Sequence, residues 1–182
     1  GFYYTSEEIF QREKDTIFMR GWLCVARVEE FEKPGDYLAT RIMGEPVMVC
    51  RGSDGKLRAF RNLCQHRGVE VAVGQGNAKR FTCRYHAWTY GTDGRLTRAP
   101  HNENVSNFDF KACRLPLLKL ETWGGYVFIN FDPNCRALNV CLDEDGVREF
   151  AAFLQPENTR TSDKFEFDVP CNWKFVPENL MD

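Results

Sequence analysis

The sequence predicts a mainly β protein, an antiparallel sandwich or small barrel with one helix at its N-terminus. Two observations indicate this class: many short apolar runs that alternate with polar residues, and glycine-rich turns between them. Tight turns at 52–55, Asp93-Gly94 and Gly124-Gly125 each predict a hairpin. The expected strands cover residues 22–28, 36–42, 46–51, 56–61, 88–90, 95–97, 117–122 and 126–131.

The two ends of the chain have a different pattern. Thr5 and Glu8 have the spacing of a capping box, and the apolar residues after them recur at helical spacing. We therefore expect a helix over about 6–19 with Thr5 as its N-cap. A short helix over 143–154 and a strand over 164–169 are expected near the other end. The expected divisions are a helix and lead-in strand over 1–40, a β domain over 41–160 and the beginning of a second domain over 161–182.

Composition and charge exclude several classes of protein. Of 182 residues, 43% are hydrophobic and 14% aromatic, which is enough for a core and argues against disorder. A net charge of −2 gives no reason to expect nucleic acid or a membrane surface as a partner. No apolar run approaches the roughly 18 residues that span a bilayer. The N-terminus also lacks a signal-peptide pattern, so we expect a cytoplasmic protein.

Eight cysteines could form four disulfides, but a cytoplasmic setting keeps thiols reduced. Cys24 and Cys50 lie in apolar runs and are expected to be buried. We expect the six cysteines other than Cys64 and Cys83 to be inert structural thiols.

A mixed set of thiols and imidazoles carries the chemistry. Cys64 and His66 lie in one predicted loop, and Cys83 and His86 lie in a second, with sixteen residues between the two pairs. Two of the three histidines fall in this C-x-H-x16-C-x2-H pattern. In a Rieske [2Fe–2S] centre two imidazoles replace two thiolates on one iron, which raises the potential to about −150 to +300 mV. Each loop would then give its cysteine to the inner iron and its histidine to the outer iron.

The alternative is a structural zinc site of the Cys2His2 type. Zinc sites usually pair like ligands within one knuckle, whereas here a cysteine and a histidine share each loop. A gap of one residue suits two metal ions better than one, so the pattern favours the cluster. Gly68 and Gly91 are expected to relieve the backbone where the two loops turn.

The two loops resemble the cluster-binding boxes of the large (alpha) subunit of Rieske non-haem iron oxygenases, which are aromatic-ring-hydroxylating dioxygenases and their monooxygenase relatives. The resemblance rests on Cys64-Gln65-His66-Arg67-Gly68 and Cys83-Arg84-Tyr85-His86-Ala87-Trp88-Thr89-Tyr90, and extends to residues 2–10, 123–130, 172–174 and 178–179. It therefore covers essentially the whole chain. One small departure is Ala87, where the family more often has glycine.

This resemblance implies a Rieske-type iron–sulfur β-sandwich over 41–160, followed by the start of a truncated α+β catalytic domain. It implies a Rieske non-haem iron oxygenase in which a ferredoxin or flavin reductase, supplied by NAD(P)H, reduces the [2Fe–2S] cluster. A mononuclear iron(II) in the missing catalytic domain would then activate dioxygen. A small aromatic substrate and a homotrimer, with or without a small beta subunit, are also implied.

Two other classes of Rieske protein share the cluster-binding pattern. Rieske proteins of respiratory chains carry an extra cysteine in each loop, and Val69 and Tyr85 occupy those positions here, so that class is excluded. A stand-alone Rieske ferredoxin-like electron carrier remains the alternative. The N-terminal helix and the segment 172–182 weigh against it.

Further residues are expected to support the site. In the resembled family, an aspartate at the position of Asp182 bridges a neighbouring subunit's cluster and the catalytic iron; a solvated carboxylate is the alternative. Trp88 is expected to shield the cluster, and Arg67 either to donate hydrogen bonds near its loop or to cap surface carbonyls. His101 is expected at the surface. A basic rim of Lys79, Arg80 and Arg84 either steers an acidic redox partner or is a solvated face.

Overall fold

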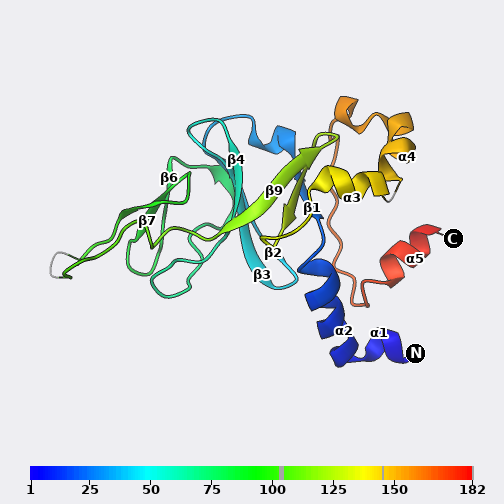
Figure 1. Cartoon of the computed structure of the whole chain (residues 1–182), viewed down its shortest axis with the longest axis horizontal. Helices are drawn as coiled ribbons and strands as arrows, with labels where there is room; N and C mark the ends of the chain where they lie inside the picture. The colour runs from blue at the N-terminus through cyan, green and yellow to red at the C-terminus, as the bar shows by residue number, and fades with distance from the viewer. Residues whose placement is uncertain (103–104, 145, 182) are drawn as a thin grey trace.

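A computed structural model describes residues 1–102, 105–144 and 146–181 (Figure 1). In these residues ten strands form two antiparallel sheets, and the expected fold class is confirmed. The larger sheet has the order β1-β10-β9-β4-β3-β2-β5 and the smaller one β6-β7-β8. The strands are β1 (Leu23–Arg27), β2 (Asp36–Ile42), β3 (Glu45–Arg51), β4 (Leu57–Arg61), β5 (Gly74–Asn77), β6 (Arg80–Thr82), β7 (Thr89–Gly91), β8 (Leu96–Arg98), β9 (Leu117–Trp123) and β10 (Tyr126–Asn130).

The three expected hairpins are present as β3–β4, β7–β8 and β9–β10. The turn at Gly94 has a structural requirement for glycine. Its φ is +79°, and a Cβ there would lie 2.4 Å from the ring of Phe60, which is buried in the larger sheet. The β7–β8 hairpin therefore packs against β4 at a distance that leaves no room for a side chain.

Strand β3 separates two apolar clusters, because successive side chains of a strand point to opposite faces. Met48 and Cys50 belong to the cluster that also contains Cys64 and Cys83. Val47 and Val49 belong to the other, with Phe31, Ala59, Val127 and Ile129 among its members. All four β3 side chains are buried, so this strand forms the centre of the fold.

The N-terminal helix differs from the prediction. It consists of α1 (Phe2–Thr5), α2 (Glu7–Glu13) and a π-helix over Lys14–Phe18. The expected N-cap Thr5 is wrong: the hydroxyl of Ser6 accepts the hydrogen bond from the Ile9 N–H at 3.4 Å. Because the third helical residue is Ile9 and not Glu or Gln, this N-cap hydrogen bond is not part of a capping box.

The C-terminal third contains α3 (Leu138–Glu144), α4 (Val147–Leu154), α5 (Phe175–Met181) and a 3₁₀-helix over Pro156–Asn158; another 3₁₀-helix, Val28–Phe31, follows β1. The helix expected over 143–154 is found as α4 and the end of α3, with Gly146 at a left-handed φ of +67° between them. The strand expected over 164–169 is wrong, since these residues pair with no described strand. Figure 1 shows this segment leading to α5, which lies near the N-terminal helices.

Across the described part of the chain, no helix has the length and apolar character needed to cross a membrane.

Candidate metal centre

The four predicted ligands lie in two turns with the same backbone hydrogen bonds. The turn between β4 and β5 carries Cys64, whose N–H donates to Val69 O (2.8 Å) and whose carbonyl accepts from the N–H of Gly68 (2.8 Å). The turn between β6 and β7 has the same two bonds around Cys83. The N–H of Cys83 donates to the carbonyl of Trp88, and the carbonyl of Cys83 accepts from the N–H of Ala87. The two loops are therefore equivalent in conformation around their cysteines.

This equivalence explains why glycine is the preferred residue at the position of Ala87. Gly68 and Ala87 occupy the same place in the two turns, with φ of +69° and +57°. A side chain in the left-handed region costs about 1–2 kcal/mol relative to glycine, which is why glycine is preferred there. The expectation that Gly91 relieves the second loop is wrong, because Gly91 pairs with Arg80 inside the sheet. Ala87 adopts the strained conformation instead.

Burial separates the thiols from the imidazoles. Cys64 and Cys83 are 2% and 3% exposed, whereas His66 is exposed and His86 is half-buried. The two imidazole rings approach each other, with centroids 4.7 Å apart. This division is expected if the cysteines bind an inner iron and the histidines bind an outer iron.

His86 has a buried nitrogen that needs a partner. Its Nδ1 has no hydrogen-bond partner in the described residues. A buried polar atom left unpaired costs free energy, so the arrangement fits an imidazole whose Nδ1 binds a metal. Burial lowers the pKa of His86, and the charges of His66 and Arg67 lower it further. The neutral imidazole, which is the form that ligates metals, is thereby favoured.

Aromatic rings flank both imidazoles. Trp88 is buried and stacks on His66, with centroids 4.9 Å apart and an angle of 10° between the rings. Tyr85 stacks on His86 at 3.8 Å and remains 56% exposed. Arg67 is exposed, and its guanidinium makes no hydrogen bond to a described residue. Trp88 thus contacts one of the predicted ligands, while its role as a shield of the cluster stays a prediction.

Tyr90 is a site residue that the sequence did not identify. Its hydroxyl lies 3.3 Å from the sulfur of Cys64 and accepts a hydrogen bond from the Gln65 N–H at 2.9 Å. Because the hydroxyl oxygen accepts from this amide, its proton is free to point to the sulfur. Burial raises the pKa of Tyr90, so the proton is retained. Tyr90 follows Trp88 by two residues, and residues two apart in an extended segment point to the same side. This spacing is the sequence signal that could have identified Tyr90 as a site residue.

The donor set combines two buried thiols with two imidazoles nearer the surface. No three His, Cys, Asp or Glu side chains of the described ranges are grouped so as to hold one metal ion. A tetrahedral zinc site gathers its ligands around a single ion, whereas a binuclear cluster takes two ligands on each iron. The burial of both thiols and the outward position of both imidazoles fit the second case.

Of the remaining candidates, Arg84 lies within the second ligand turn, between Cys83 and His86. His101 is exposed, as expected. The basic rim of Lys79, Arg80 and Arg84 is exposed as well. Asp182 lies outside the described residues. All eight cysteines are free thiols. Cys50 is buried, but Cys24 is exposed, contrary to expectation, because Leu23 and Val25 on either side of it pack against the core and Cys24 points to the opposite face of β1.

Comparison with known proteins defines the class first. Residues 21–109 match the Rieske [2Fe-2S] domain. With the paired cysteine and histidine turns, this identifies a Rieske domain within the chain.

Relatives then define the family. The chain is 38% identical, over 99% of its length, to the carnitine monooxygenase oxygenase subunits of Acinetobacter pittii and Escherichia coli K12, and covers 49% and 48% of them. It is 34% identical, over 97% of its length, to the benzene 1,2-dioxygenase alpha subunit of Pseudomonas putida, of which it covers 40%. The chain contains a Rieske domain and is homologous to Rieske oxygenase alpha subunits, and it spans about half the length of the curated relatives it matches.

Solved structures agree with this assignment. A quaternary ammonium Rieske monooxygenase in complex with L-carnitine matches all of this chain and 51% of its own, with a TM-score of 0.90 and 37% identity. A naphthalene 1,2-dioxygenase with phenanthrene bound matches 84% of this chain and 34% of its own, with a TM-score of 0.75 and 34% identity.

Proposed function

We propose that this chain is the electron-transferring N-terminal part of a Rieske oxygenase alpha subunit. Cys64 and Cys83 would hold the inner iron of a [2Fe–2S] cluster, and His66 and His86 the outer iron. When bound, the cluster accepts and releases one electron at a time. The observation that carries the proposal is the buried Nδ1 of His86, which has no partner among the described residues, beside two turns of equivalent backbone structure.

The surrounding residues have separate roles in this proposal. The thiols lie within an apolar cluster that excludes water, whereas the imidazoles lie at the surface, where a redox partner can approach. Trp88 and Tyr85 fix the planes of the two imidazoles by stacking. Tyr90 holds a proton toward the sulfur of Cys64.

We propose that the mononuclear iron(II) that activates dioxygen lies in a part of the protein outside these 182 residues, so that this chain alone oxidises no substrate. Three features expected from the sequence belong to the same proposal: a homotrimer, reduction by a ferredoxin or flavin reductase, and a basic rim that attracts this donor. The division at residues 40 and 160, the Asp182 bridge and the cytoplasmic location stay predictions. A stand-alone carrier is disfavoured because the likeness to oxygenases includes the N-terminal helices and α5.

The substrate has two candidate classes. A quaternary ammonium compound is favoured, since the match to the monooxygenase solved with L-carnitine covers the whole chain, whereas the match to naphthalene dioxygenase covers 84%. The small aromatic compound expected from the sequence is the second candidate, supported by the likeness to benzene dioxygenase. Product analysis of the intact protein with its reductase, using L-carnitine and benzene in parallel, decides between them.

A ligand test for this chain compares three histidines. His66→Ala and His86→Ala are expected to lose iron and acid-labile sulfide together. His101→Ala is the matched control and keeps both, because that side chain is exposed and lies outside the two turns. A His86→Ala protein with unchanged iron, sulfide and EPR signal contradicts the ligand assignment.

A further inference from the structure

Two segments that the family resemblance singled out, at opposite ends of the sequence, contact each other. The Tyr4 hydroxyl donates to Glu178 at 2.7 Å, and its ring stacks on Phe175 with centroids 4.7 Å apart. The side chain of Asn172 donates to the carbonyl of Tyr4 at 3.1 Å. The N-terminal helices therefore hold the segment that contains α5.

Glu13 is the centre of this contact. Its carboxylate accepts from the ammonium of Lys174 at 2.6 and 2.9 Å and from the indole N–H of Trp173 at 2.9 Å. The side chains of Glu13 and Lys174 are only 15% and 19% exposed, so solvent screens the pair less than a surface ion pair. These hydrogen bonds, that of Lys174 first, hold the pKa of Glu13 below its ordinary value.

The π-helix explains how both Glu13, at the end of α2, and Phe18 reach this segment. Phe18 packs edge-on against the ring of Trp173, with centroids 5.0 Å apart, while Glu13 bonds the indole nitrogen. In a regular α-helix, residues five apart are separated by about 140° around the axis and do not share a face. Here the N–H of Met19 donates to the carbonyl of Lys14 at 2.9 Å, the five-residue bond of a π-turn. The wider turn brings residues 13 and 18 to the same side.

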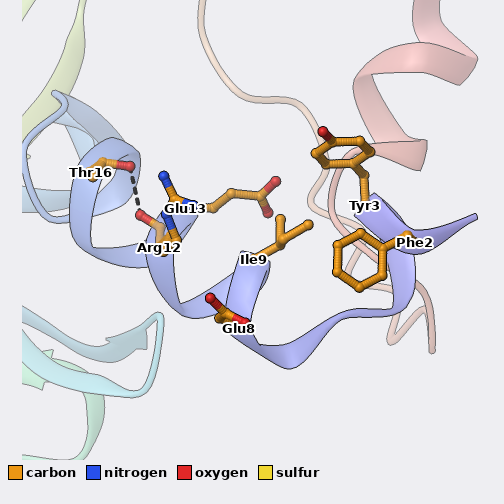
Figure 2. Close-up of a pocket in the computed structure, with 7 residues that line it drawn as sticks. All are labelled: Phe2, Tyr3, Glu8, Ile9, Arg12, Glu13 and Thr16. Atoms are coloured by element: carbon orange, nitrogen blue, oxygen red, sulfur yellow. Dashed lines mark hydrogen bonds between the residues drawn. The ribbon is translucent and has the colours of Figure 1, made fainter.

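Glu8 provides a comparison on the same helix. Figure 2 shows the Glu13 side chain extending from α2 toward the C-terminal segment, whereas that of Glu8 points away from it. Glu8 is exposed and makes no side-chain hydrogen bond to a described residue. The position of the carboxylate, and not the acidic character of the helix, makes the contact.

We propose that Glu13 is a positioning residue, which holds Trp173 and Lys174 and thereby fixes α5 against the N-terminal helices. The consequence for catalysis rests on the proposed function, in which the second iron lies in the part of the protein that follows α5. Fixing α5 then sets the placement of that part relative to the cluster loops. Misplacement of reacting groups by about 1 Å can slow a reaction by about a hundredfold.

The first experiment uses this chain and needs no oxygenase activity. The hydrogen exchange of the Trp173 indole N–H is measured by NMR, with Trp173→Phe to assign the resonance. Glu13→Gln removes the charge, and exchange is expected to accelerate at least about tenfold, because hydrogen bonds to charged groups are the stronger ones. Glu8→Gln is expected to change nothing. Unchanged exchange in Glu13→Gln, or equal acceleration in Glu8→Gln, overturns the proposal.

A second variant covers the case in which Glu13→Gln does not fold. Lys174→Gln breaks the same ion pair from the other side and is expected to accelerate the exchange less, because the bond between Glu13 and the indole remains. The exchanged pair Glu13→Lys with Lys174→Glu is not expected to recover the protection, because a lysine at position 13 offers no acceptor to the indole N–H. No acceleration in Lys174→Gln overturns the assignment.

The catalytic consequence is tested in the intact protein by single turnover. Glu13→Gln is expected to slow re-oxidation of the reduced cluster by substrate and dioxygen, with the cluster potential and EPR signal unchanged. An unchanged rate overturns the positioning role. If the parent protein binds no cluster, the proposed function fails instead, while the indole exchange still reports on Glu13.

Discussion

Replacing Tyr90 by phenylalanine removes one oxygen beside the proposed cluster and leaves the buried ring in place. That oxygen lies 3.3 Å from the sulfur of Cys64 and 2.9 Å from the N–H of Gln65. With the cluster bound, the sulfur is a thiolate and can only accept, so the hydroxyl must be the donor. A donor directed at the sulfur stabilises the reduced state more, because reduction adds negative charge.

The magnitude follows from the strength of such a bond. Hydrogen bonds to charged groups contribute about 1.5–3 kcal/mol. If about 1–2 kcal/mol of this distinguishes the reduced from the oxidised state, the potential falls by about 40–90 mV, since about 59 mV corresponds to a tenfold change for one electron. Stability is expected to fall by only about 1 kcal/mol, because the Gln65 N–H loses its acceptor.

The assay is a redox titration of the loaded protein followed by EPR. Tyr37→Phe is the matched control: its hydroxyl bonds the carbonyl of Val73 at 3.3 Å, and its ring packs on the same core cluster as Tyr90. The control is expected to keep the parent potential. An intact cluster in Tyr90→Phe whose potential is unchanged, or higher, refutes this role of the hydroxyl.

Three further predictions concern stability, thiol reactivity and pH. The guanidinium of Arg27 is buried and donates hydrogen bonds to three carbonyls, which Arg27→Met removes. This substitution is expected to lower the free energy of unfolding, measured by urea titration, by about 2–3 kcal/mol. A loss no larger than that of Arg41→Met, at an exposed position, contradicts the prediction. Burial raises the pKa of Cys50 to about 12, whereas Cys171 is exposed. Maleimide at pH 8 should therefore label Cys171 and leave Cys50 unlabelled, as followed by mass spectrometry. Equal labelling rates for the two thiols would disprove this difference in reactivity. The ammonium and indole donors of the C-terminal segment hold the pKa of Glu13 below 4.5, so its contribution to the attachment of α5 is complete above that pH and lost as pH falls through the lowered pKa. The NMR resonance of the Trp173 indole N–H should therefore shift on acidification in the parent protein but not in Glu13→Gln. Equal shifts in both proteins argue against this assignment of the titration to Glu13.

Local patterns predicted the strands that alternate or follow a marked turn. The strand predicted over 36–42 is β2, with the same ends. Strand β5 has the sequence Gly-Gln-Gly-Asn, which has no apolar alternation, and it is a strand only because it pairs with β2. The segment 164–169 shows the reverse case. It alternates through Phe165, Phe167 and Val169, but no described strand pairs with it.

The site was predictable to the extent that its chemistry is local in sequence. Cysteine and histidine spacing identified the four candidate ligands, and aromatic residues near them identified Trp88. Long-range contacts gave no such signal: Tyr90 meets Cys64 across 26 residues, and Glu13 meets Lys174 across 161. The left-handed conformation of Ala87 was not predictable either, because alanine rarely adopts a positive φ.

The central claim is that two thiolates and two imidazoles from these turns share one binuclear iron–sulfide unit. The most direct measurement is EPR with nitrogen ENDOR on the reduced protein, carried out with and without ¹⁵N-labelled histidine. The account predicts about two irons and two sulfides per chain, with couplings from two histidine nitrogens that change on labelling. A colourless protein that contains zinc, or an iron–sulfur signal without histidine nitrogen couplings, would contradict it.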